Sequence, residues 1–238
     1  SLLVLAAGMG SRYGGIKQID PVGAHGETLL DYSVYDAMTS GYGKVVFIIR
    51  PDIEKDFRER LFDRIARNMD AEYVFQTHES YLDSTSLELS KDRTKPWGTV
   101  HAVLCAKDAM KTPFTVINAD DYYGREAYGI LGNYLSTLSN DSTEHAMVGY
   151  LLKNTMSPMG SVSRGVCKVK DNLLQSMVEN TKIEYQGSEI VSHMSYGDDK
   201  LTGDEWVSMN FFGFTPQVSE SKTQYWQAFI TENASSAK

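Results

Sequence analysis

The first residues with a chemical signature combine glycine with two cations. Leu5 to Gln18 reads Leu-Ala-Ala-Gly-Met-Gly-Ser-Arg-Tyr-Gly-Gly-Ile-Lys-Gln and includes Gly8, Arg12 and Lys17. Glycines let backbone N–H groups approach phosphate oxygens closely, and the two basic side chains add fixed positive charge. This combination predicts a loop that binds a polyphosphate.

Two common phosphate motifs do not fit this loop. A Walker A motif requires Gly-Lys followed by Ser or Thr, whereas Ile16 precedes Lys17 and Gln18 follows it. The dinucleotide fingerprint requires a third glycine where Tyr13 stands, and it would not account for Arg12. The loop therefore belongs to another class of phosphate site.

An acidic pair follows a second apolar run. Asp120 and Asp121 follow Phe114–Asn118 after one alanine, and Phe114–Asn118 reads as a buried strand. Open α/β sheets bind their ligands at the carboxyl ends of strands, and Mg²⁺ prefers carboxylate and phosphate oxygens. We therefore expect Asp120 to bind a metal. The alternative role is to cap the next helix, for which Asp121 is the better candidate.

The first half of the chain alternates strands and helices, which predicts an α/β fold with a mostly parallel sheet and helices on both faces. The predicted strands are 2–6, 44–50, 71–77 and 114–118, and the predicted helices are 29–40, 51–67 and 98–110. Residues 78–97 show no periodicity and are expected to be irregular.

The second half has a different pattern, with shorter and more alternating runs. After a helix that ends near residue 138, the predicted strands are 146–152, 165–170, 173–178, 183–185 and 207–214. This pattern predicts a more antiparallel half, built as a lid or insertion onto the same sheet. We expect a single domain over 1–238, with a nucleotide-binding half (1–124) and an acceptor-binding half (125–238).

The charge balance excludes several functions. The net charge is −8, from 23 Lys+Arg and 31 Asp+Glu, which disfavours general binding to nucleic acid or to an anionic membrane.

The 5 histidines lack the spacing of zinc ligands, and the 2 cysteines are too few for a disulfide scaffold. No membrane span or leader is recognised, and Ser1 suggests that a few N-terminal residues are missing. A soluble, cytoplasmic protein is expected.

The phosphate loop resembles that of the nucleotidylyltransferases that activate sugar phosphates. Their pattern is L-A-A-G-x-G-S/T-R followed by Lys, and Leu5–Arg12 with Lys17 matches it. Further similar segments follow in the family's order, from residue 2 to about 216: 97–102, 116–124, 163–166, 177–179 and 207–214. The resemblance implies a Rossmann-like fold of the nucleotide-diphospho-sugar transferase type.

The resemblance also implies a reaction and a set of roles. The reaction is a Mg²⁺-dependent transfer of a nucleoside monophosphate from a nucleoside triphosphate to a sugar phosphate, with release of pyrophosphate. Arg12 and Lys17 would be catalytic, and Asp120 and Asn210 would bind the metal. The nucleotide-binding residues would be Ala6, Ala7, Gly8, Gly10, Ser11, Gly98 and Thr99, and the acceptor-binding residues would be Gly165 and Glu179. The partners would be a nucleoside triphosphate and a phosphorylated small molecule, with no nucleic acid and no membrane.

Three departures from the family pattern leave the acceptor open. Only four residues separate Arg12 from Lys17, as in relatives that make molybdenum-cofactor dinucleotides. The lysine that usually adjoins the glutamate is displaced to Lys182, and Asn210 stands where many members have aspartate. The acceptor could therefore be an alditol, methylerythritol or cofactor phosphate. A regulator that binds nucleotide sugars without turnover is a third hypothesis. The base and the oligomeric state stay open, and 76–97 is expected to contribute to base choice.

Overall fold

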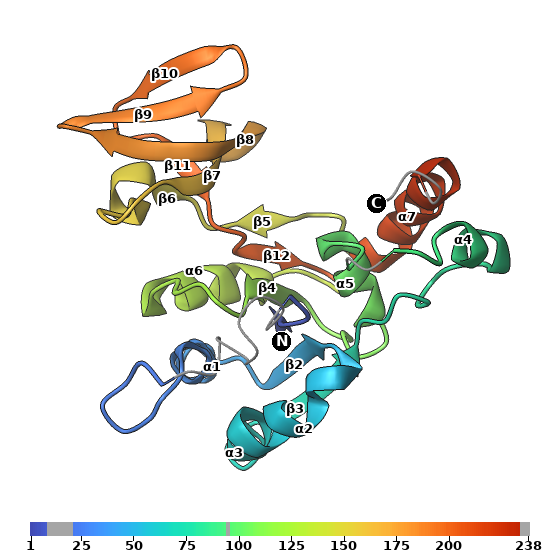
Figure 1. Ribbon diagram of the computed structural model, residues 1–238. Helices are drawn as coiled ribbons and strands as arrows, with labels where there is room; N and C mark the ends of the chain where they lie inside the picture. The colour runs from blue at the N-terminus through green and yellow to red at the C-terminus, as the bar shows by residue number, and fades with distance from the viewer. Residues whose placement is uncertain (9–20, 94–95, 234–238) are drawn as a thin grey trace. The chain divides into compact units, whose positions relative to one another are not determined.

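The chain forms two compact units, shown in Figure 1, and the computed structural model describes residues 1–8, 21–93 and 96–233. Unit 1 comprises Ser1–Ala146 and Phe212–Lys238, and unit 2 comprises Met147–Phe211. The division at residue 124 concerns what each half binds and stays a prediction. Among the described residues, no helix has both the length and the apolar composition needed to span a bilayer.

Unit 1 is built on a mostly parallel sheet of 6 strands in the order β3-β2-β1-β4-β12-β5. The strands are β1 (Leu2–Leu5), β2 (Lys44–Ile49), β3 (Asp70–Phe75), β4 (Phe114–Asn118), β5 (Ala146–Met147) and β12 (Phe212–Phe214). β1 lies between β2 and β4 and is parallel to both, whereas β12 runs antiparallel to β4. The predicted mostly parallel sheet is confirmed.

Helices cover both faces of this sheet. The ring of Phe47 in β2 contacts Phe57 at 5.2 Å between centroids, while its neighbours Val46 and Ile48 pack with residues of α5, including Ala102. Because successive strand residues point to opposite faces, the two sets of helices lie on opposite sides. The helices are α1 (Leu29–Thr39), α5 (Thr99–Cys105), α6 (Arg125–Leu135) and α7 (Val218–Asn233), with the helical segment 51–65.

The predicted helix 51–67 appears as the helical segment 51–65, which is not a uniform α-helix. Ile53, Phe57, Leu61 and Ile65 recur every fourth residue and are all buried on one apolar face. The segment comprises the 3₁₀ turn η2 (Pro51–Ile53), α2 (Glu54–Phe57), the π-helical η3 (Arg58–Phe62) and α3 (Asp63–Ile65). An α-helix has fewer than four residues per turn, so side chains spaced by four residues rotate gradually around its axis. The π turn of η3 has more residues per turn and keeps these side chains on one face.

Three predictions for unit 1 need correction. The segment after β3 is not wholly irregular, because α4 (Ser84–Leu89) forms there and the Asp83 carboxylate accepts a hydrogen bond from Ser86 N at 2.7 Å. α5 ends at Cys105 rather than near residue 110, and turns follow it. α7 was not predicted.

Unit 2 is an antiparallel sheet of 6 strands in the order β10-β9-β8-β7-β11-β6, which confirms the more antiparallel second half. The elements are β6 (Tyr150–Leu151), η4 (Leu152–Thr155), β7 (Val162–Lys170), β8 (Leu173–Gln186), β9 (Glu189–Met194), β10 (Gly197–Leu201) and β11 (Trp206–Ser208). Its core is formed by Leu152, Ile183, Ile190 and Val207.

The strand boundaries in this part of the chain differ from the predictions. The two predicted strands 173–178 and 183–185 are one strand, β8, and neither β9 nor β10 was predicted. The predicted strand 207–214 is instead β11 and β12, which belong to different sheets. Asn210 lies between them with φ +62°, and asparagine is one of the few side chains that tolerate this left-handed conformation.

Candidate functional site

The carboxyl ends of β1 and β4 lie side by side in unit 1. Leu5 pairs with Asn118, and Ala119 N donates to Leu5 O at 3.2 Å. The segment 6–8 therefore leaves the sheet next to the segment that carries Asp120. The structure thus brings together the predicted nucleotide-binding residues Ala6, Ala7 and Gly8 and the predicted metal ligand Asp120. Four other predicted residues lie outside the described residues: Gly10, Ser11, Arg12 and Lys17.

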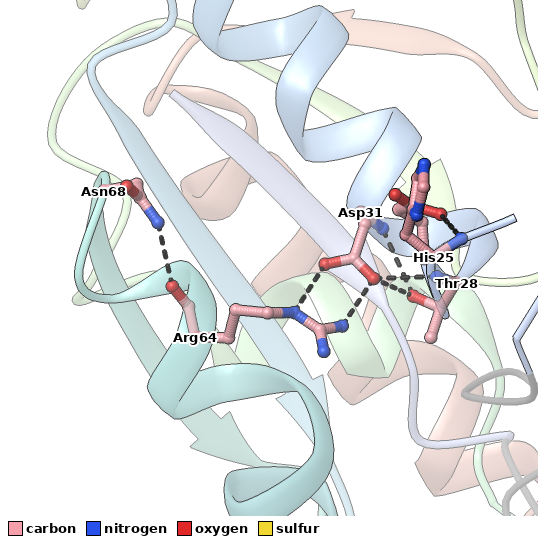
Figure 2. Close-up of polar contacts among 6 residues, drawn as sticks. His25, Thr28, Asp31, Arg64 and Asn68 are labelled. Atoms are coloured by element: carbon pink, nitrogen blue, oxygen red, sulfur yellow. Dashed lines mark hydrogen bonds and ion pairs between the residues drawn. The ribbon is translucent and has the colours of Figure 1, made fainter. Parts of the chain in front are cut away.

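The start of α1, which follows the predicted phosphate-binding segment in the sequence, is anchored by side-chain hydrogen bonds. Thr28 is the N-cap of α1 and forms a capping box with Asp31, whose carboxylate also accepts hydrogen bonds from Thr28 N and Oγ1. Arg64, at α3, donates to the same carboxylate, with Nε at 3.1 Å from Oδ1 (Figure 2). The helix that follows the loop is therefore tied to the neighbouring helical segment by a bidentate ion pair.

The two adjacent aspartates after β4 have different environments. Asp121 Oδ2 accepts hydrogen bonds from Asn118 Nδ2 at 2.9 Å and from the Tyr123 hydroxyl at 3.4 Å. Asp120 is exposed and makes no hydrogen bond or ion pair with the described residues. The N-cap of α6 is Gly124, with φ +79° and no side-chain cap, so the proposed capping role of Asp121 is wrong. Asp121 is thus held within the turn after β4, whereas Asp120 is exposed and has no partner among the described residues.

The residues at the carboxyl ends of β1 and β4 fit a weakly bound hard cation rather than a preformed metal site with several protein ligands. No group of three His, Cys, Asp or Glu side chains converges on a metal position within the part of the chain that the structure describes. Mg²⁺ commonly uses only one or two carboxylates and keeps several waters or substrate phosphate oxygens. The exposed Asp120 carboxylate, which has no partner in the part of the chain that the structure describes, fits this coordination. Mg²⁺ itself stays a prediction.

On the other side of β1, the predicted nucleotide-binding residues Gly98 and Thr99 form the start of α5. Gly98 has φ +92°, a conformation that favours glycine, and Thr99 is the first helical residue. Gln76, directly after β3, donates from Nε2 to Gly98 O at 3.2 Å and to His101 Nδ1 at 3.0 Å. From the sequence, base choice was assigned only to 76–97 as a whole, and neither Gln76 nor His101 was singled out.

Gln76 also lines a cavity of about 130 Å³. The Trp97 ring stacks on His78 with 5.6 Å between centroids, and Arg93 Cζ lies 4.2 Å from the Trp97 centroid. His78 Nε2 and Arg93 Nε are buried and have no partner among the described residues. The cavity is thus lined by the Trp97 ring together with polar and basic residues. Its lining residues are Arg50, Gln76, Thr77, His78, Arg93, Pro96 and Trp97.

In unit 2 the structure brings together the two predicted acceptor-binding residues. Gly165 in β7 pairs directly with Glu179 in β8, so both lie on the same face of the antiparallel pair. Ser163 Oγ donates a hydrogen bond to Glu179 Oε1. A Cβ at Gly165 would lie 2.8 Å from Met177 Sδ, so a larger residue there would require the exposed Met177 side chain to move. Lys182 is ion-paired with Glu184 at 3.5 Å rather than with Glu179.

Asn210 also belongs to unit 2. Its backbone N–H donates to Ser208 Oγ at 3.2 Å, and its side-chain amide makes no hydrogen bond with the described residues. The amide oxygen is therefore not committed elsewhere in the described part of unit 2. Its assignment as the second metal ligand stays a prediction.

Two solved structures share the fold of the whole chain. One is a Bacillus anthracis protein assigned as a glucose-1-phosphate thymidylyltransferase and crystallised with sucrose; it has a TM-score of 0.58 and 12% identity, and the match covers 98% of this chain and 81% of that one. The other is HddC from Yersinia pseudotuberculosis, with a TM-score of 0.52, 15% identity, and coverage of 92% and 78%. No family model matches the chain, and no curated protein matches it. The chain therefore has the mixed α/β fold of the nucleotide-diphospho-sugar transferase type.

Proposed function

We propose that the protein is a Mg²⁺-dependent nucleotidylyltransferase that transfers a nucleoside monophosphate from a nucleoside triphosphate to a sugar phosphate and releases pyrophosphate. The observation that carries the proposal is the adjacency of segment 6–8 and Asp120 at the carboxyl ends of β1 and β4. Segment 6–8 leads into the glycine-rich sequence with its two cations, and the Asp120 carboxylate makes no hydrogen bond or ion pair with the described residues. A predicted phosphate-binding segment that begins next to such a carboxylate suits a metal-bound triphosphate.

The proposed chemistry needs positioning and charge stabilisation more than proton transfer. The acceptor phosphate oxygen is already an anion when it attacks the α-phosphorus, so no general base is required. Arg12 would hold the β- and γ-phosphates and offset charge on the leaving pyrophosphate. Lys17 would bind the α-phosphate and the acceptor phosphate together. Mg²⁺ on Asp120 would offset further charge on the triphosphate.

The remaining roles divide between the two units. In unit 1, Gly98 and Thr99 would lie against the nucleoside. Gln76, which is hydrogen-bonded to Gly98 O, would contribute to base choice. In unit 2, the backbone of Gly165 and the Glu179 carboxylate would hold acceptor hydroxyls. The shared face of Gly165 and Glu179 supports a hydroxylated acceptor.

The pairing of Lys182 with Glu184 favours a second candidate acceptor class. The family's lysine beside the glutamate is then not available at its usual position, so the chain could use an alditol, methylerythritol or cofactor phosphate instead. The reaction would be the same. The two candidates differ only in the acceptor.

The test is a pyrophosphate-release assay with each common nucleoside triphosphate against a panel of sugar, alditol and cofactor phosphates. We expect release with one triphosphate and one acceptor class, dependent on Mg²⁺ and lost in Asp120→Asn. If pyrophosphate is released only with a non-sugar phosphate, the acceptor belongs to the second candidate class. Nucleotide binding without release for any pair would contradict the transferase proposal and favour a regulator.

A further inference from the structure

A short hydrogen-bond relay links the end of β3 to α5. Gln76 is anchored by its backbone N–H, which donates to Ile49 O at 2.9 Å. Its Nε2 lies 3.2 Å from Gly98 O and 3.0 Å from His101 Nδ1, while His101 Nε2 lies 2.7 Å from Ser80 O. Gln76 is 8% exposed and His101 is 0% exposed, so both side chains depend on these partners.

The two carbonyl groups in this relay fix the direction of every hydrogen bond. A carbonyl oxygen only accepts, so His101 Nε2 must carry a hydrogen for Ser80 O, and the atom of Gln76 near Gly98 O must be its nitrogen. In a neutral imidazole with hydrogen on Nε2, Nδ1 is an acceptor and receives the other Gln76 amide hydrogen. The amide orientation and the histidine tautomer therefore determine each other.

This arrangement decides which atom Gln76 offers to a ligand. Both amide hydrogens are committed, and Oε1 has no partner among the described residues. Gln76 lines the cavity of about 130 Å³ beside Trp97. The group left for a ligand is therefore a hydrogen-bond acceptor, which requires an N–H donor on the ligand.

The surroundings of His101 keep the relay neutral and in place. Burial lowers the pKa of His101 below its ordinary value, and it raises the pKa of the nearby Cys105 thiol to about 11. The titratable groups that face the ring are Cys105 from α5 and His78 and Tyr81 from the segment after β3. From α7, the Trp226 ring lies 4.7 Å from the imidazole and its Nε1 donates to Tyr81 O at 2.9 Å.

We infer that His101 is a positioning residue that, through Gln76, presents a hydrogen-bond acceptor to an N–H group of the nucleobase. This inference rests on the proposed function only in taking a nucleoside triphosphate as the ligand. His101 does not touch the base. It prevents the Gln76 amide from turning its nitrogen toward the ligand, where a donor would select a different base edge.

The test begins with the full chain without nucleotide. Nitrogen NMR of labelled histidine should show His101 as the neutral tautomer with hydrogen on Nε2. The tautomer with hydrogen on Nδ1, or a protonated ring at neutral pH, would overturn the inference whatever the enzyme activity.

Calorimetric titration with each of the four common nucleoside triphosphates then tests the link to base choice. We expect His101→Leu to reduce the preference for the best triphosphate by about 10-fold, because one oriented hydrogen bond is lost. His101→Asn is the matched control: its carbonyl oxygen can accept from Gln76, so it should keep the preference within about 3-fold. Gln76→Leu should match His101→Leu, and the double variant should lose nothing further.

Additive losses in the double variant, or equal preferences in wild type and His101→Leu, would overturn the positioning role. Selective binding without pyrophosphate release would remove the transferase proposal and leave this inference standing. A wild-type chain that binds no nucleoside triphosphate would overturn both.

Discussion

The two adjacent aspartates after β4 allow a matched test of the site. The structure gives Asp121 two hydrogen bonds, at 2.9 Å and 3.4 Å, and gives Asp120 none with the described residues. We therefore expect Asp121→Ala to destabilise the protein and Asp120→Asn to abolish activity. The two aspartates are adjacent in the sequence, so each variant serves as a control for the other.

The size of the stability effect follows from the two hydrogen bonds. The shorter one contributes about 1 kcal/mol and the longer one about half as much, so Asp121→Ala should lower the free energy of unfolding by about 1.5 kcal/mol. For a chain of this length that corresponds to a Tm about 4 °C lower. Asp120→Asn should shift the Tm by less than about 1 °C, because it removes an exposed charge from an acidic protein.

The assay combines thermal melts in chelator with pyrophosphate release across a Mg²⁺ series. Asp120→Asn should be inactive at every Mg²⁺ concentration, and Asp121→Ala should keep measurable activity below its melting temperature. The reverse pattern, with Asp121→Ala inactive at native Tm or Asp120→Asn unfolded without metal, would refute the assignment. Asn210→Ala should have a milder effect on the Mg²⁺ dependence than Asp120→Asn, since an amide oxygen binds Mg²⁺ less strongly than a carboxylate.

Lys17→Ala should lower turnover by several hundred-fold with an unchanged melt, because a phosphate-contacting lysine acts mainly on the transition state, where losing such a contact costs roughly 3–4 kcal/mol; unchanged turnover would reject the role. Tyr42→Phe should lower the free energy of unfolding by about 1.5 kcal/mol, measured by urea titration, because the buried hydroxyl hydrogen-bonds to Thr115 Oγ1 at 2.6 Å; an unchanged urea midpoint would contradict this. Since burial lowers the pKa of His101, the unfolded chain protonates first, and stability should fall as the pH drops below about 6.5. His101→Asn should lack that part of the pH dependence, and identical pH profiles would contradict the assignment.

The central strands and the buried face of the helical segment 51–65 were predictable because their apolar residues form clear patterns in the sequence. β2 is buried along almost its whole length, and positions 53, 57, 61 and 65 mark one helix face. β10 could not be recognised, since Gly197–Leu201 is largely exposed and has no alternation. α7 was missed because only Val218, Trp226 and Ile230 of its residues are buried, which leaves little amphipathic signal.

The candidate site was predictable in its residue types more than in its contacts. The sequence places two aspartates after β4, but only the hydrogen bonds of Asn118 and Tyr123 distinguish Asp121 from Asp120. The relay from Gln76 to His101 joins residues that are far apart in the chain, so no local pattern reveals it. Asn210 reads as mid-strand, whereas its positive φ marks a change of sheet.

The way unit 2 is joined to unit 1 gives the chain a modular character. β5 and β12 are neighbours in the sheet of unit 1, and unit 2 lies between them in the sequence. The two ends of unit 2 meet, because Val148 N donates to Phe211 O at 3.1 Å. A short turn in place of the intervening residues would join β5 directly to its neighbour β12. Under the proposed function, in which unit 2 holds the acceptor, a different insert grafted at this junction should change acceptor preference, while β1 and β4 keep their sequence and pairing.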